Sequence, residues 1–197
     1  MSQTGQMIIS IYTEMTPNPE TMKFVANKLL YPGKSIDFRE EKEATPSALA
    51  QALFAFPFVN GVFIASNFVT LTKTQETEWV DVIPTIRQFL KTYLEEGNEI
   101  INEALVPHQS TKENVISDAD TDVVTRIKEM LENYVKPAVE MDGGAISFVG
   151  FENGVVTLLL QGSCSGCPSS MITLKSGIEG MMKRMIPEVT EVIAENV

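Results

Sequence analysis

Apolar residues in the first half of the chain recur at two spacings. Alternation over a few residues is typical of strands, and recurrence every three to four residues is typical of helices. Gly97 and Asn98 then supply a stop for the last helix of this half. The expected elements are strands at 7–12, 22–25, 58–64 and 68–72, the last two forming a hairpin that turns at 65–67, and helices that begin after Thr45 and span 79–94.

Thr45 and Pro46 carry the start signal of the first of these helices. A threonine suits the N-cap, where its hydroxyl accepts from a free backbone N–H, and proline suits the first helical position. Leu49, Leu53 and Phe54 then share one face. We therefore expect an N-terminal α+β domain over residues 1–96.

The second half also combines strand patterns and helix patterns, in another order. Ser117-Asp118 predicts a helix start, and Pro137 either ends or kinks that helix. Asn153-Gly154 between two β-rich runs is a strong hairpin signal. The expected elements are a helix from 118, strands at 145–151 and 155–160, a helix from Pro168 and a short strand at 189–193. This order is α-β-β-α-β over residues 118–197.

Residues 97–117 are mixed and polar, and we interpret them as a linker with a short helix around 100–105. The predicted fold class is therefore α+β, with two small α+β domains joined by this polar linker.

The formal net charge of -11 makes the chain a poor candidate for nucleic-acid binding, which needs clustered lysine and arginine. We find no signal peptide, transit peptide or membrane-spanning run in the 197 residues. The pattern therefore predicts a cytoplasmic protein that binds neither nucleic acid nor a membrane.

Chemistry concentrates at Cys164 and Cys167, the only two cysteines of the chain. In a reducing compartment such a CxxC pair is a metal site or a redox pair more often than a structural disulfide. The pair lies between a predicted strand and a helix that begins at Pro168. The positive end of that helix dipole favours thiolate, the form that binds metal.

Two observations favour metal over dithiol redox chemistry. The chain lacks the pattern of a thioredoxin-like unit around the pair, and the central residues Ser165 and Gly166 are neither aromatic nor basic. A [4Fe–4S] or [2Fe–2S] cluster takes about four cysteine ligands, and His108, the lone histidine, lies far away in the linker. Two chains would supply four thiolates, so we expect a cluster-bridged homodimer. The same count permits a bridging zinc ion.

Residues 137–189 resemble the C-terminal domain of the NifU family, and residues 7–94 resemble the N-terminal domain of Nfu-type proteins. The first resemblance rests on Met141-Asp142-Gly143-Gly144, on the run from Leu160 to Ser170 around the cysteines, on Thr173–Glu179 and on Ile186-Pro187-Glu188-Val189. The second rests on Thr16-Pro17-Asn18-Pro19, Lys23-Phe24, Gly61-Val62-Phe63, Val69–Lys73 and Glu78-Trp79. One departure is Ala145, where many relatives carry an acidic residue.

The resemblance implies a scaffold or carrier that holds a [4Fe–4S] cluster on Cys164 and Cys167. Such a protein would take the cluster from upstream assembly proteins and deliver it to apo iron–sulfur proteins by ligand exchange, without enzyme activity. The rival functions are a thiol–disulfide oxidoreductase and a zinc-bridged structural dimer.

Overall fold

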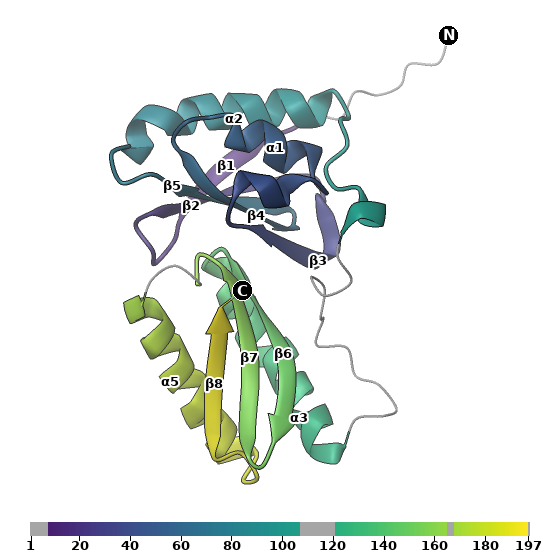
Figure 1. Ribbon diagram of the computed structural model, residues 1–197, viewed down its shortest axis with the longest axis vertical. Coiled ribbons are helices and arrows are strands. Elements are labelled where there is room, and N and C mark those ends of the chain that lie inside the picture. The colour runs from purple at the N-terminus through teal and green to yellow at the C-terminus, as the bar shows by residue number, and fades with distance from the viewer. Residues whose placement is uncertain (1–7, 107–120, 165–167, 197) are drawn as a thin grey trace. The chain divides into compact units, whose positions relative to one another are not determined.

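The computed structural model describes residues 8–106, 121–164 and 168–196, which form two compact units (Figure 1). The first unit is built mainly from the chain up to Pro107, and the second mainly from the chain after it. Each unit combines a sheet with helices, so the predicted α+β class with two small domains is confirmed.

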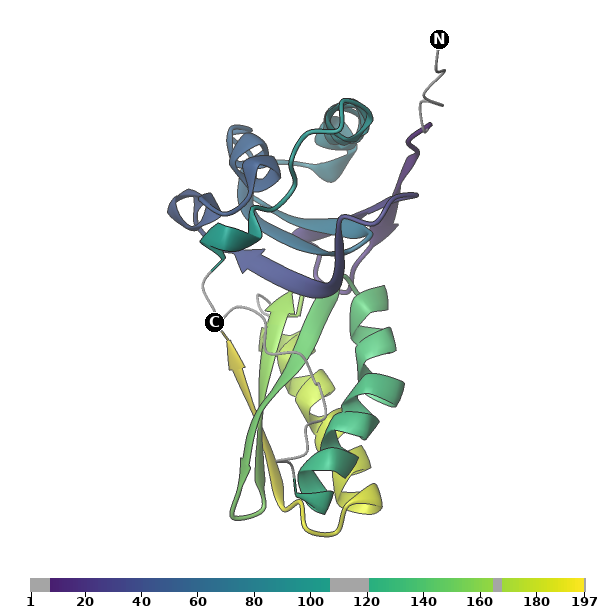
Figure 2. The ribbon, with the colours of Figure 1, turned by 90° about the vertical axis from the view of Figure 1, so that its right-hand side faces the viewer.

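The first unit is organised around a five-stranded antiparallel sheet in the order β1-β2-β5-β4-β3. Helices α1 and α2 lie on one face of this sheet (Figure 2). The apolar side chains on that face, with Leu49, Leu53, Ile86 and Leu90 from the helices, form its core. The strands are β1 (Ile11–Met15), β2 (Thr21–Ala26), β3 (Tyr31–Phe38), β4 (Val59–Ser66) and β5 (Phe68–Lys73), and the helices are α1 (Ala48–Phe54), α2 (Trp79–Glu95) and the 3-10 turns η1 (Glu41–Ala44) and η2 (Glu103–Leu105).

The N-cap of α1 differs from the prediction. The cap is Ser47, whose hydroxyl accepts from the Ala50 N–H at 3.0 Å and donates to the Ile100 carbonyl at 2.7 Å. Thr45 instead ends the 3-10 turn η1. A serine hydroxyl both donates and accepts, so Ser47 can cap the helix and also hold residues 98–102 against it.

Strand β1 begins four residues later than the predicted 7–12. Its ladder with β2 pairs Met15 with Met22 and Ile11 with Ala26, directly outside the turn that joins the two strands. Before Ile11, Asn27 pairs with the chain partly through its side chain. Its backbone N–H donates to the Ser10 carbonyl at 3.2 Å, while Nδ2 donates to the Ile8 carbonyl and Oδ1 accepts from the Ser10 N–H. The short turn thus fixes the register.

Strand β3 was not predicted. Its sequence includes Pro32 and Gly33, which weaken a strand pattern. The strand lies at the edge of the sheet, and its pairing with β4 shifts register between Tyr31 and Ser35. Edge position and a bulge are the places where a sheet tolerates proline.

Residues 98–106 pack on the first unit. Ile100, Ile101 and Val106 contact its core, and the Asn102 N–H donates to the Pro46 carbonyl at 2.7 Å. The predicted short helix in this segment is the 3-10 turn η2. The domain boundaries at 96 and 117 stay predictions.

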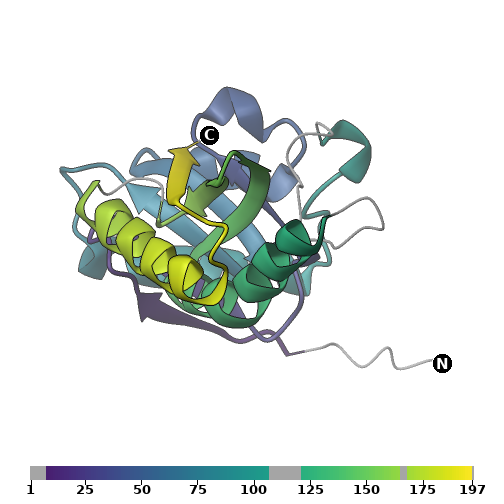
Figure 3. The ribbon, with the colours of Figure 1, turned by 90° about the horizontal axis from the view of Figure 1, so that it is seen from below.

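The second unit pairs a three-stranded sheet with helices on one of its faces (Figures 2 and 3). Strand β7 is central, antiparallel to β6 and parallel to β8. The elements are α3 (Asp122–Met130), a π-helical turn η3 (Leu131–Val135), α4 (Lys136–Met141), β6 (Gly144–Glu152), β7 (Val155–Gly162), α5 (Pro168–Met185) and β8 (Glu191–Asn196). The predicted α-β-β-α-β order is therefore observed.

Pro137 does not end the first helical run of this unit. The chain passes from α3 through the wider turn η3 into α4, where Pro137 occupies the second position. Proline removes one N–H donor and crowds the preceding turn, and a π-turn is one way a helix accommodates this. The predicted start at Ser117-Asp118 lies outside the described residues, within which Thr121 caps α3.

The turn between β6 and β7 and the alternation of buried and exposed residues in β7 orient the sheet. Asn153 and Gly154 both adopt positive φ, of 51° and 84°, as a two-residue hairpin turn requires. In β7, Val156, Leu158 and Leu160 are buried and alternate with partly exposed residues, so the strand turns one face to the helices.

Two glycines inside α5 predict a stabilising substitution. Gly177 and Gly180 are exposed, and a Cβ at either position meets nothing within 4 Å. Gly177→Ala and Gly180→Ala should each raise the free energy of unfolding of the second unit by about 0.5–1 kcal/mol, because alanine loses less backbone entropy in a helix. Urea unfolding followed by NMR signals of the second unit measures this.

The matched control is Gly154→Ala. Gly154 has a φ of +84° and its Cβ would lie 2.6 Å from Thr190 Oγ1, so this change should destabilise the same unit. A loss of stability in both Gly177→Ala and Gly180→Ala would contradict the prediction, because it would show that helix propensity at these positions does not stabilise the unit.

Candidate metal centre

Cys164 follows the last residue of the central strand β7. Gly162 ends the strand with a φ of +68°, a left-handed conformation that glycine adopts without strain. Ser163 and Cys164 come next, and α5 begins at Pro168, as predicted. The second predicted ligand, Cys167, lies outside the described residues, as do Gly166 and His108. The geometry below is therefore that of the Cys164 half of the motif.

The Cys164 side chain is buried in the core of the second unit. It is 7% exposed and belongs to the same apolar cluster as Ile146, Leu160 and Ile178. Gly144 at the start of β6 lies against it: a Cβ on Gly144 would be 2.9 Å from Cys164 Sγ and 2.6 Å from the Gln161 carbonyl oxygen. A side chain at position 144 would therefore collide with the thiol and with the β7 backbone.

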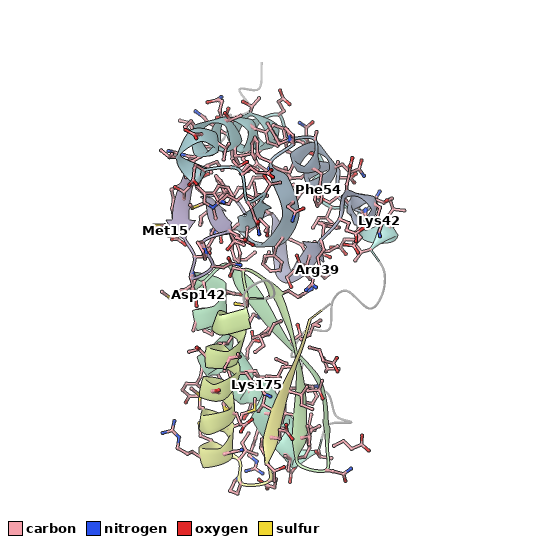
Figure 4. All side chains as sticks on the ribbon, turned by 60° about the vertical axis from the view of Figure 1, so that its left-hand side comes forward. Met15, Arg39, Lys42, Phe54, Asp142 and Lys175 are labelled. Atoms are coloured by element: carbon pink, nitrogen blue, oxygen red, sulfur yellow. The ribbon has the colours of Figure 1, made fainter. Side chains whose placement is uncertain are left out.

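Ser163 joins the cysteine segment to the end of α4. Its hydroxyl donates to the Asp142 carbonyl, and its N–H donates to the Gly143 carbonyl at 3.3 Å. Gly143 has a φ of +81° and ends the helix in the left-handed conformation usual after a C-cap. Asp142 is labelled in Figure 4. The Asp142-Gly143-Gly144 sequence is thus a helix end and a turn into β6.

The environment of Cys164 raises the pKa of its thiol from an ordinary 9.0 to about 11. The main cause is burial, which disfavours the charged thiolate. The Ser163 hydroxyl, 3.8 Å from Sγ, lowers the pKa, and the nearby Asp142 carboxylate raises it. The pKa of the Cys164 thiol is therefore raised, the opposite direction to that expected from the helix dipole.

This raised pKa predicts a loss of stability at alkaline pH. The unfolded thiol ionises near pH 9, while the folded thiol stays neutral until about pH 11. The contribution is therefore fully present below pH 9 and falls as pH rises through 11, by about 2–3 kcal/mol at most. The metal-free chain and Cys164→Ala, both kept reduced, should differ by this pH-dependent amount in urea titrations at pH 8 to 11. Parallel curves would show that the thiol is solvated in the folded state.

Within residues 8–106, 121–164 and 168–196, no group of three or more histidine, cysteine, aspartate or glutamate side chains is arranged to hold a metal ion. No helix in the same residues is long and apolar enough to cross a membrane.

Sequence reasoning missed two features of this site. The Ser163 hydroxyl and N–H fasten the loop to α4. Gly144 makes room for the thiol. The Gly143-Gly144 pair was the available signal, since adjacent glycines often mark a close approach of backbone.

The chain matches two family descriptions in order. Residues 11–97 match "Scaffold protein Nfu/NifU N terminal", and residues 127–193 match "NifU-like domain". A protein from Drosophila persimilis named "NFU1 iron-sulfur cluster scaffold homolog, mitochondrial" is 39% identical over 193 residues, which are 98% of this chain and 67% of the relative. The chain belongs to the Nfu/NifU family.

The Drosophila virilis relative bears the same printed name. It is also 39% identical over 98% of this Nfu/NifU chain, which spans 63% of that relative's length. Both relatives are named as mitochondrial, and this overturns the expectation of a cytoplasmic protein. That expectation rested on finding no targeting segment in the 197 residues, and the names of both relatives contradict it.

Two solved structures resemble parts of this Nfu/NifU chain. The solution NMR structure of a NifU-like protein from Saccharomyces cerevisiae is 30% identical, with a TM-score of 0.46, over 52% of this chain and 92% of that one. A crystal structure of a protein from Staphylococcus aureus is 21% identical, with a TM-score of 0.36, over 41% of this chain and 98% of that one.

Proposed function

We propose that this Nfu/NifU chain is an iron–sulfur cluster scaffold that holds a [4Fe–4S] cluster on the thiolates of Cys164 and Cys167 and passes it to apo-proteins. The relatives named as iron–sulfur cluster scaffolds support the role. The same relationship favours a carrier without catalytic activity. A [2Fe–2S] cluster is the alternative cargo on the same ligands.

The observation that carries the proposal is the fastening of the Cys164 segment. Its backbone is tied to α4 through Ser163, and its thiol lies against the bare backbone of Gly144. A metal ligand has to be held in place by its neighbours before the metal arrives. Here the neighbours are the end of a helix and the start of a strand, both parts of the core.

Ligand number supports a shared site. A cluster of either type takes about four cysteine ligands, and the chain contains two cysteines in all. Two copies related by a two-fold axis provide four. A dimer held by its own cargo also suits delivery, since the cysteines of a recipient displace the thiolates one at a time.

Loading a cluster changes the state of Cys164. The buried neutral thiol loses its proton, because thiolate is the form that binds iron. The charge of a bound iron offsets the penalty that burial imposes on thiolate.

Anaerobic reconstitution with iron and sulfide tests the proposal, followed by Mössbauer spectroscopy and iron and sulfide analysis. We expect roughly four irons for every two chains, the stoichiometry of one bridging four-iron cluster. Tight binding of zinc with no uptake of iron would contradict the scaffold function and indicate a zinc-bridged structural dimer. A reversible two-electron redox couple on a metal-free monomer would contradict the scaffold function and indicate a thiol–disulfide oxidoreductase.

A further inference from the structure

The outer edge of β1 lies open beside helix α2. The strand is last in the order of the first sheet, and no strand of the described residues pairs with its second edge (Figure 1). Large apolar side chains along it are exposed: Ile8 by 80%, Tyr12 by 52% and Met15 by 87%. An edge of this kind is a template for another strand unless charge or proline protects it.

The backbone groups that face this edge are those of Ile11 and Thr13. Both Ser10 groups face β2, since its carbonyl accepts from the Asn27 N–H at 3.2 Å and its N–H donates to Asn27 Oδ1 at 3.0 Å. Strand residues alternate in direction, so Ile11 and Thr13 face the other way. The Ile11 carbonyl shows this directly, because it accepts from Arg87 Nε of α2 at 3.0 Å.

A groove of about 560 Å³ runs between this edge and α2. Residues 8–11 form one wall, and Pro84, Arg87, Gln88 and Lys91 form the other. The charged side chains of this lining are both cations. Lys91 lies 3.9 Å from Glu95 in a partly exposed i,i+4 pair, a kind of contact that contributes little to stability.

We propose that this groove binds an acidic, extended segment of a partner protein as a sixth strand of the first sheet. Backbone groups of the segment pair with Ile11 and Thr13, and its carboxylates meet Arg87 and Lys91. An N–H of the segment replaces the Arg87 donor at the Ile11 carbonyl, which frees the guanidinium for a carboxylate.

The probe is an acetylated, amidated seven-residue peptide in which glutamate alternates with threonine and valine, added to the isotope-labelled full chain. NMR should show chemical-shift changes along β1 and α2, and hydrogen exchange at the Ile11 and Thr13 amides should slow by about tenfold or more. A peptide with lysine in place of every glutamate should bind much more weakly. Added salt should weaken binding of the acidic peptide.

Lys91→Glu is the test variant, and Lys42→Glu is its control of equal charge. Lys42 lies in η1, on the opposite side of the first unit from Met15 (Figure 4). We expect Lys91→Glu to weaken binding about fivefold, since it exchanges an attraction for a repulsion, and Lys42→Glu to leave it unchanged. Cluster loading at the cysteines should be the same in both variants.

Four results would overturn this site. The first is binding of the lysine peptide as tightly as the acidic peptide. The second is an equal loss of binding in Lys91→Glu and Lys42→Glu. The third is protection of the Ile11 and Thr13 amides in the free monomer, which would mean that the chain covers its own edge. The fourth is protection that grows with protein concentration, which would assign the edge to a second copy.

Discussion

Cys164→Ser and Cys167→Ser are each expected to abolish stable cluster loading. Each substitution removes one thiolate from every chain, so a bridged dimer retains two ligands where a cluster needs about four. Loss of the cluster should also remove the dimer, because a ligand that binds only the dimer is what draws monomers together. Anaerobic analytical ultracentrifugation before and after loading, with iron analysis of each species, measures both effects.

Three comparisons sharpen this experiment. Mixed dimers with one intact chain retain three cysteine ligands and should hold a labile cluster. Cys164→Ala should fail to load in the same way as the serine variant, although it leaves no polar group in the core. His108→Ala should load like the parent chain, since the histidine is not an expected ligand. A loaded species that stays monomeric at micromolar concentration would contradict the bridged site and call for ligands from outside the chain.

Gly144→Ala is expected to destabilise the second unit by about 1–3 kcal/mol, the usual cost of forcing an extra carbon into a packed site. The new Cβ would lie 2.6 Å from the Gln161 carbonyl oxygen, a backbone atom that cannot move away without disturbing the pairing of β6 with β7. It would also lie 2.9 Å from Cys164 Sγ. The thiol has to shift, so cluster loading should fall together with stability.

Gly150→Ala is the matched control for this change. Gly150 lies in the same strand, and its Cβ would meet nothing within 4 Å. Urea unfolding followed by NMR signals of the second unit should show a large loss for Gly144→Ala and little change for Gly150→Ala. The fluorescence transition of Trp79, the only tryptophan, reports the first unit and should be the same in both. Equal stability of the two variants would show that Gly144 has more room than the structure gives it.

Features of the second unit that depend on neighbouring residues followed from the sequence. Asn153 and Gly154 predicted the hairpin because a two-residue turn needs positive φ at both positions. Pro168 marked the start of α5, because proline suits the first turn of a helix. Each of these signals acts over a few neighbouring residues, where residue type decides the backbone conformation.

Errors in the first unit arose where distant parts of the chain decide. Strand β3 tolerates Pro32 because it lies at the edge of the sheet, and edge position is a property of topology. Ser47 caps α1 in place of Thr45 because its hydroxyl also reaches the carbonyl of Ile100, far along the chain. Thr45 and Ser47 are equally good caps by type, so local preference could not separate them.

The sequence by itself determined the α+β class and the two-part organisation, because residue type, spacing and period carry that information. Its assignment of thiolate chemistry to the pair of cysteines stays a prediction. Only the tertiary structure decided the surroundings of Cys164. The pairing of β6 with β7 brings Gly144 against its thiol, and packing against the helices buries it and raises its pKa. Burial and close approach arise from contacts between residues about 20 positions apart or more, and no local pattern records them.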